Sequence, residues 1–274
     1  MIGTELHVTR DGARLRVALS PSAGRPTLVL LHGITDGAAT WGRVAERLAG
    51  RYSLVMPDAR GHGGSSRITG TIDIATLVDD AAAVLDHIAT GPVLLWGHSM
   101  GAETAARLAG ARPDLVRAAV LEDPPFHDAP PAESAGGDDD PHLAAFVELL
   151  HSVGDMTPEQ RMAMARGSNP GWHDDELVPW ADTKADFDTA ALTLLDGGLG
   201  RDWRAAVAAI ACPTLLVTGD AGAIVTPEVA AEAAALAPTA RVVRIDGAGH
   251  SVHRDRFDAT VAAVTSFLRD VAAD

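Results

Sequence analysis

Residues 93–101 read VLLWGHSMG, and an alanine-rich segment follows them directly. The apolar run predicts a buried strand and the alanine-rich segment a helix, so the G-x-S-x-G pattern lies on a strand–turn–helix corner. In so tight a turn the serine backbone is strained and flanking side chains would collide, which explains Gly97 and Gly101. The Ser99 hydroxyl would lie beside a helix N-terminus, with the Met100 N–H facing a developing negative charge. We therefore predict Ser99 as a nucleophile and Met100 as an oxyanion-hole donor.

Strand-like and helix-like segments alternate on both sides of this corner. Apolar runs rich in Val, Leu and Ile predict strands buried on both faces, and helices between such strands predict a parallel α/β sheet. Segments 5–9 and 13–19, separated by Asp11-Gly12, predict a hairpin at the sheet edge. The predicted strands are 27–31, 52–56, 93–96, 118–121, 214–218 and 242–245, and the predicted helices are 38–49, 72–89, 100–110, 227–237 and 256–272.

The alternation stops after Leu121 and resumes near Asp202. The intervening segment starts with Pro130-Pro131 and the GGDDD run at 136–140, which predict a loop, and continues as short helices broken by Gly and Pro. A helical insertion into an α/β sheet predicts a lid over a pocket, because pockets favour interfaces between domains; a helical subdomain with its own small core is the alternative. We expect a core domain of 1–126 and 204–274 and a helical cap of 127–203.

Composition and charge exclude several classes of function. Lys and Arg total 22 against 37 Asp and Glu, and the net charge of −15 argues against a nucleic-acid or membrane-surface partner. The single cysteine, Cys212, can form no intrachain disulfide. Residues 1–20 lack the pattern of a signal peptide, and no apolar run reaches the roughly 18 residues that span a bilayer. We expect a cytoplasmic protein that acts on a small molecule, and a homodimer is left open.

A second motif lies at 30–35, where the sequence LLHGIT ends a predicted strand in His32-Gly33. The glycine allows a turn that makes the Ile34 N–H a second oxyanion donor. The turn-forming neighbours of His32 favour a hydrogen-bonding role for its ring over that of a base.

The chain resembles the α/β-hydrolase superfamily along almost its whole length. The matching motifs are His32-Gly33, DARGHGGS at 58–65, GHSMG at 97–101 and GAGH at 247–250. The resemblance implies a mostly parallel eight-stranded sheet in the order 1-2-4-3-5-6-7-8, with a cap inserted after strand 6. It also implies that Asp58 and Arg60 fix the loop after strand 4 rather than perform chemistry.

The order serine, acid, histidine in this superfamily points to His250 as the base. His250 follows the last predicted strand, and His253 is its nearest rival. His98, adjacent to Ser99, is expected to point away from the serine.

The acid departs from the commonest pattern of the superfamily. Most members carry an aspartate where this chain has Gly222, and Asp220 comes too early. Haloalkane dehalogenases, some lipases and zearalenone lactonases place the acid after strand 6, where this chain has Glu122-Asp123. Adjacent residues at a strand end point to opposite sides, so only one should face the histidine. The register favours Asp123; Glu122 is the alternative, and a third interpretation is that both only accept hydrogen bonds from loop amides.

The resemblance implies a serine hydrolase that cleaves a carboxylic ester or lactone through an acyl-enzyme. The substrate would be apolar and medium-sized, with a macrocyclic lactone such as zearalenone worth testing. Candidate substrate contacts are Trp172 and Trp180, for which core packing is the alternative, together with His32 and Gly33.

Other functions are kept open by particular features. Gly222 at the usual acid position allows a ligand-binding receptor or an inactive relative, and carbon–carbon bond hydrolases share the same motifs. A serine nucleophile disfavours dehalogenase and epoxide-hydrolase chemistry, which uses an aspartate there. The sequence contains neither a metal-ligand motif nor a dinucleotide fingerprint, so we expect no metal and no cofactor.

Overall fold

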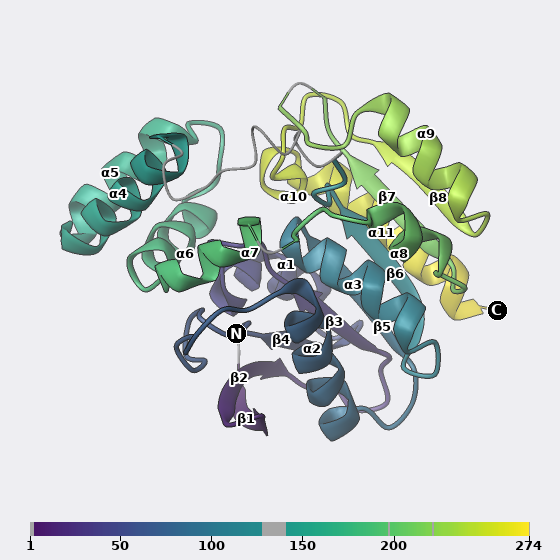
Figure 1. Ribbon diagram of the computed structural model, residues 1–274. Coiled ribbons are helices and arrows are strands. Elements are labelled where there is room, and N and C mark those ends of the chain that lie inside the picture. Colours follow the sequence, from purple (N-terminus) through teal and green to yellow (C-terminus); the bar gives the residue numbers. More distant parts are fainter. Residues whose placement is uncertain (1–2, 128–140, 197, 221, 274) are drawn as a thin grey trace.

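The computed structural model describes residues 3–127, 141–196, 198–220 and 222–273 (Figure 1). The predicted loop with Pro130-Pro131 and 136–140 lies outside these ranges. Within them, no helix combines the length and the apolar character needed to cross a membrane.

The sheet has eight strands in the order β1-β2-β4-β3-β5-β6-β7-β8, which confirms the predicted order. Strands β1 and β2 form the predicted hairpin, β2 also pairs antiparallel with β4, and the remaining pairs are parallel. The strands are β1 (Thr4–Arg10), β2 (Ala13–Ser20), β3 (Thr27–Leu31), β4 (Ser53–Pro57), β5 (Val93–His98), β6 (Val116–Glu122), β7 (Thr214–Thr218) and β8 (Ala240–Arg244).

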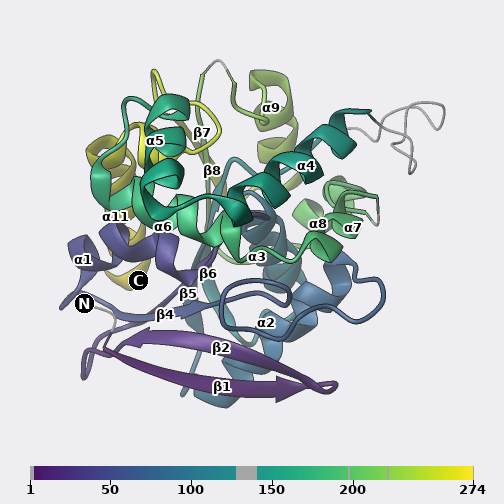
Figure 2. The same ribbon diagram turned by 90° about the vertical axis from the view of Figure 1, so that its left-hand side faces the viewer.

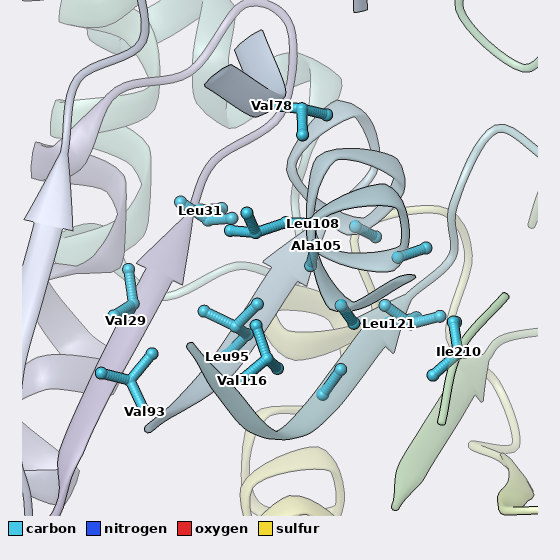
Figure 3. Close-up of a cluster of buried hydrophobic side chains, with 14 of the residues drawn as sticks. Val29, Leu31, Val78, Val93, Leu95, Ala105, Leu108, Val116, Leu121 and Ile210 are labelled. Atoms are coloured by element: carbon cyan, nitrogen blue, oxygen red, sulfur yellow. The ribbon is translucent and has the colours of Figure 1, made fainter. Parts of the chain in front are cut away.

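Helices cover both faces of the sheet, so alternate residues of the central strands enter two different cores. In β5, Val93 and Leu95 pack on one face and Leu94 and Trp96 on the other. Figure 3 shows the first of these cores, where Leu95 lies beneath side chains of α3. The first face carries α2 (Ile74–Ile88), α3 (Met100–Ala111), α8 (Trp203–Ala208) and α9 (Pro227–Leu236), and the second η1 (Ala38–Trp41), α1 (Gly42–Leu48), α10 (Val252–Asp255) and α11 (Phe257–Ala273).

A helical insertion follows β6, where the resemblance places a cap. Figure 2 shows its helices on the opposite side of the molecule from β1 and β2. The limits of this unit, 127 and 203, stay a prediction. Trp203, the last residue of the predicted unit, packs in the core on the first face of the sheet and stacks on Phe126 with ring centroids 4.9 Å apart. The inserted helices are α4 (Pro141–Asp155), α5 (Pro158–Ser168), α6 (Asp174–Ala185), η2 (Thr189–Leu192) and α7 (Thr193–Asp196).

Candidate active site

Ser99 occupies the corner between β5 and α3 in a strained backbone conformation. Its φ of 53° and ψ of −120° are unusual for a residue with a side chain and cost roughly 1–3 kcal/mol. A Cβ on Gly97 would collide with the Gly101 carbonyl, and a Cβ on Gly101 with the Leu31 carbonyl. The Ser99 N–H donates to the Glu122 carbonyl oxygen at 2.9 Å, so the corner is anchored to the end of β6.

His250 and Asp123 form a close pair at the same edge of the sheet. The His250 Nδ1–H donates to Asp123 Oδ2 at 2.6 Å, which leaves Nε2 free to act as a base. Asp123 is fully buried and also accepts from the backbone N–H groups of Ile224 at 2.8 Å and Val225 at 3.0 Å. In the described ranges no hydrogen bond joins Ser99 to His250; such contacts are often loose without substrate and tighten in the complex.

Glu122 faces the other way and binds His253. The backbone N–H and the Nδ1–H of His253 donate to Glu122 Oε1 at 2.9 and 2.7 Å, and Trp96 Nε1–H donates to Oε2 at 2.9 Å. Burial alone would raise the pKa of Glu122, but the charge and hydrogen bonds of His253 outweigh it and lower this pKa to about 2.

Glu122 and His253 were both candidates from the sequence, one for the acid and one for the base, but they were not predicted to pair. Two adjacent acids that point to opposite sides, and the two histidines His250 and His253 three positions apart, were the available signal. His253 is itself fully buried and stacks on Trp41 with ring centroids 4.7 Å apart. The pair therefore anchors the segment after His250 beneath the surface of the site.

Ile34 and Met100 carry the two backbone N–H groups that were predicted to form an oxyanion hole. Within the described part of the chain, the Ile34 and Met100 N–H groups donate to no protein acceptor. Met100 opens α3, so its N–H also carries the positive end of the helix dipole. Both groups are therefore free for a substrate oxygen.

The His32 ring is held by the backbone around it. Its Nε2 accepts from the Ala59 N–H at 2.9 Å, and its Nδ1–H donates to the Gly33 carbonyl at 2.8 Å. A Cβ on Gly33 would come within 3.1 Å of His98 Nδ1, so this loop packs tightly on the nucleophile corner. His98 in turn donates from Nε2 to the His250 carbonyl at 3.1 Å.

Two further acids near the site are occupied by loop contacts. The Asp58 carboxylate accepts from Ala38 N–H at 2.7 Å and Gly64 N–H at 3.1 Å, whereas Arg60 pairs with Asp80 of α2 at 2.7 Å. Asp220 accepts from the Gly247 N–H, and thereby ties the end of β7 to the loop that carries His250. Gly222 has a φ of 89°, which an aspartate would adopt only with strain.

Trp172 and Trp180 pack in an apolar cluster of the insertion itself, as the alternative of core packing predicts. Their rings meet edge to face, with centroids 5.7 Å apart, and pack on Ala165, Leu177 and Ala181. The Trp172 Nε1–H donates to Asp255 Oδ1 at 2.7 Å, and Asp255 Oδ2 accepts from the Gly249 N–H at 2.8 Å. Asp255 therefore connects the insertion to Gly249, the residue before His250.

Known proteins resemble the chain both in sequence and in structure. A 2-(acetamidomethylene)succinate hydrolase of Mesorhizobium japonicum is 27% identical over 94% of this chain and 93% of its own. An N-formylmaleamate deformylase of Pseudomonas putida is 32% identical over 88% of each chain. A crystal structure of an E-2-(acetamidomethylene)succinate hydrolase matches with a TM-score of 0.82, at 25% identity, over 97% of this chain and 99% of that one. The model of the alpha/beta hydrolase family matches residues 28–263, and the chain therefore belongs to this family.

Proposed function

We propose that this protein is a serine hydrolase that cleaves a carboxylic ester or lactone through an acyl-enzyme. The observation that carries the proposal is the 2.6 Å hydrogen bond from His250 Nδ1 to the buried Asp123 carboxylate, beside the strained corner that bears Ser99. The arrangement supplies a nucleophile, a base and an orienting acid, each on a different segment of one sheet edge.

The reaction follows from these positions. Ser99 Oγ attacks the substrate carbonyl carbon while His250 Nε2 accepts the hydroxyl proton, and the Ile34 and Met100 N–H groups stabilise the oxyanion. The tetrahedral species collapses as His250 returns the proton to the leaving alcohol, and Ser99 remains acylated. A water then gives a proton to His250 and attacks the acyl carbon. The second tetrahedral species releases the acid as His250 returns that proton to Ser99 Oγ. Asp123 stabilises the imidazolium in both steps.

The substrate class is proposed as apolar and medium-sized, with Trp172 and Trp180 as candidate contacts beside the His250 loop. A macrocyclic lactone such as zearalenone belongs in the test panel. A second candidate function is hydrolysis of an N-acyl group, because two relatives that match nearly the whole chain are named for an acetamidomethylene compound and for a deformylase.

Intact-mass measurement after incubation with a fluorophosphonate tests the proposal. We expect one adduct on the wild type, none on Ser99→Ala, and one on the matched control Ser152→Ala, whose half-buried serine lies on α4 and donates to the Leu149 carbonyl. Aryl esters, lactones and N-formyl or N-acetyl amides would then be screened for turnover. An unlabelled wild type would contradict the hydrolase and favour a receptor-like or inactive relative.

A further inference from the structure

The sequence contains one lysine, Lys184, against 21 arginines. It lies on α6 of the insertion, yet only 9% of it is exposed. Its ammonium donates to Thr35 Oγ1 at 3.1 Å, lies 3.8 Å from Asp36 Oδ1, and covers the Trp180 ring with its Nζ 3.8 Å from the ring centroid. A buried ammonium with these partners is fixed in place, and two of the partners directly follow the oxyanion donor Ile34.

Asp36 joins this lysine to the other segments of the site. Arg254, four residues after His250, donates from Nη2 to Asp36 Oδ2 at 2.8 Å. His98, the residue before Ser99, places Nδ1 3.8 Å from the same oxygen. The carboxylate is buried, at 4% exposure. Asp36 belongs to the loop that also carries Ile34, here called the oxyanion loop, and it joins this loop to the nucleophile corner, the segment after His250 and the insertion.

We propose that Lys184 and Asp36 are positioning residues, through which α6 of the insertion holds the oxyanion loop in its reactive geometry. This inference rests on the proposed function. Packing agrees with it, because a Cβ on Gly37 would come within 3.2 Å of the Thr183 methyl group on α6. The oxyanion loop is thus clamped between the core and α6, and an ionic contact sets its final position.

Electrostatics makes the contact sensitive to pH. Burial lowers the pKa of Lys184 to about 8, with Asp36 acting to raise it and Arg254 to lower it further. Burial raises the pKa of Asp36, but Arg254, His98 and Lys184 together hold it well below its usual range. Glu176 of α6 lies 3.8 Å from Arg254 Nε, and Arg43 of α1 lies 3.9 Å from Glu176, so these two charges also face the cluster. As pH rises through about 8, Lys184 loses its proton and the contact weakens, whereas Asp36 stays ionised.

Steady-state kinetics of Lys184→Met and Lys184→Arg test the proposal. A displaced donor loop reduces turnover by roughly 10- to 100-fold, so we expect Lys184→Met to lose kcat to this extent with KM changed less than about threefold. Lys184→Arg keeps the charge and should recover most of kcat. The matched control is Asp182→Asn, on the same helix as Lys184, which removes only an exposed contact to Arg161 of α5. Its kcat should equal that of the wild type. A Lys184→Met enzyme with wild-type kcat would overturn the proposal.

The pH profile separates positioning from a general loss of structure. The wild-type kcat should fall above pH 8, and Lys184→Arg should lack this alkaline limb because a guanidinium stays charged. A limb that persists unchanged in Lys184→Arg would contradict the role of the lysine. This comparison also holds if Lys184→Met fails to fold.

A spectroscopic titration tests the contact without using activity. Selective ¹⁵N-lysine labelling gives one side-chain signal, since the chain has one lysine. We expect Lys184 to titrate near pH 8 in the wild type and lower in Asp36→Asn, which removes the charge that raises its pKa. A titration near the ordinary value of about 10.4, or one that Asp36→Asn does not move, would refute the contact. If fluorophosphonate labelling fails but Lys184 titrates near pH 8 as expected, the result would refute the proposed hydrolase alone.

Discussion

Replacing Asp123 by asparagine should remove most of the turnover while the protein stays folded. Asp123 Oδ2 accepts from both His250 Nδ1–H and the Ile224 N–H, and Oδ1 accepts from the Val225 N–H. An amide has one acceptor oxygen, so its NH₂ group must replace either Oδ2, where it faces the imidazole and the Ile224 N–H, or Oδ1, where it faces the Val225 N–H. Facing the imidazole, it forces the proton of His250 onto Nε2, where the ring cannot accept a proton from Ser99.

The size of the loss follows from these contacts. A wrong tautomer in a triad lowers kcat by about 10⁴-fold, equivalent to about 5 kcal/mol on the barrier. If the NH₂ group instead replaces Oδ1, the imidazole keeps its acceptor and kcat falls less, while the unpaired Val225 N–H lowers stability by roughly 1–3 kcal/mol. We therefore expect the kcat of Asp123→Asn to fall by about 10²- to 10⁴-fold.

Glu122→Gln is the matched control, since it makes the same chemical change one residue earlier. Glu122 contacts His253 and Trp96 rather than His250. Its carboxylate also accepts three hydrogen bonds in a fully buried position, so an amide there leaves a donor facing a donor. We expect its kcat to stay within about tenfold of the wild type and its Tm to fall by several degrees, at roughly 2–4 °C per kcal/mol.

Both variants would be compared with one aryl ester for kcat and by circular dichroism for Tm. We expect a crossed result, in which Asp123→Asn loses more activity and Glu122→Gln loses at least as much stability. Equal and small losses of kcat in both variants would refute Asp123 as the triad acid. A larger loss of kcat in Glu122→Gln would transfer that role to Glu122.

Two further predictions concern the corner and the buried pair. Gly101→Ala should prevent soluble expression or lower Tm by well over 5 °C, because its Cβ would overlap the carbonyl groups of Leu31 and His32; a variant that melts like the wild type would contradict the tight packing of the corner. The pKa of Glu122, about 2 in the folded state, lies below its ordinary value of 4.5, so its contribution to stability is complete above about pH 4.5 and is lost as the pH falls toward 2. Urea unfolding between pH 5 and 2 should therefore show a shallower loss of stability for Glu122→Gln than for the wild type, and parallel curves would speak against the ionised pair.

Much of the fold was predictable because its signals are local. Apolar runs of four or five residues between helical segments predicted the central strands, and the glycines at 97 and 101 predicted the corner from steric limits alone. The predicted ends of the strands were less accurate. Strand β6 begins two residues before the predicted 118 and ends one after 121, because pairing with β5 and β7 continues to Glu122 whatever the hydropathy of that residue.

The choice between the two acids lay beyond the sequence. Alternation showed that Glu122 and Asp123 point to different sides, but not which side holds which histidine. The backbone of Asp123 adopts a φ of 41°, which turns its carboxylate toward His250, and the strand conformation of Glu122 turns its side chain toward His253. Such a conformation depends on the packing of three strands and a loop.

The sequence by itself determined the alternation of strands and helices, the helical insertion and the position of Ser99, because periodicity and steric limits act over a few neighbouring residues. The order of the strands in the sheet was predicted only through the resemblance to a known family. Only the tertiary structure decided the partners of Asp36, Lys184 and Arg254, which lie up to 218 positions apart in the chain. Buried charges need an opposite charge or a hydrogen bond nearby, but any acid can meet this need, so pairing is fixed only when the whole chain has packed.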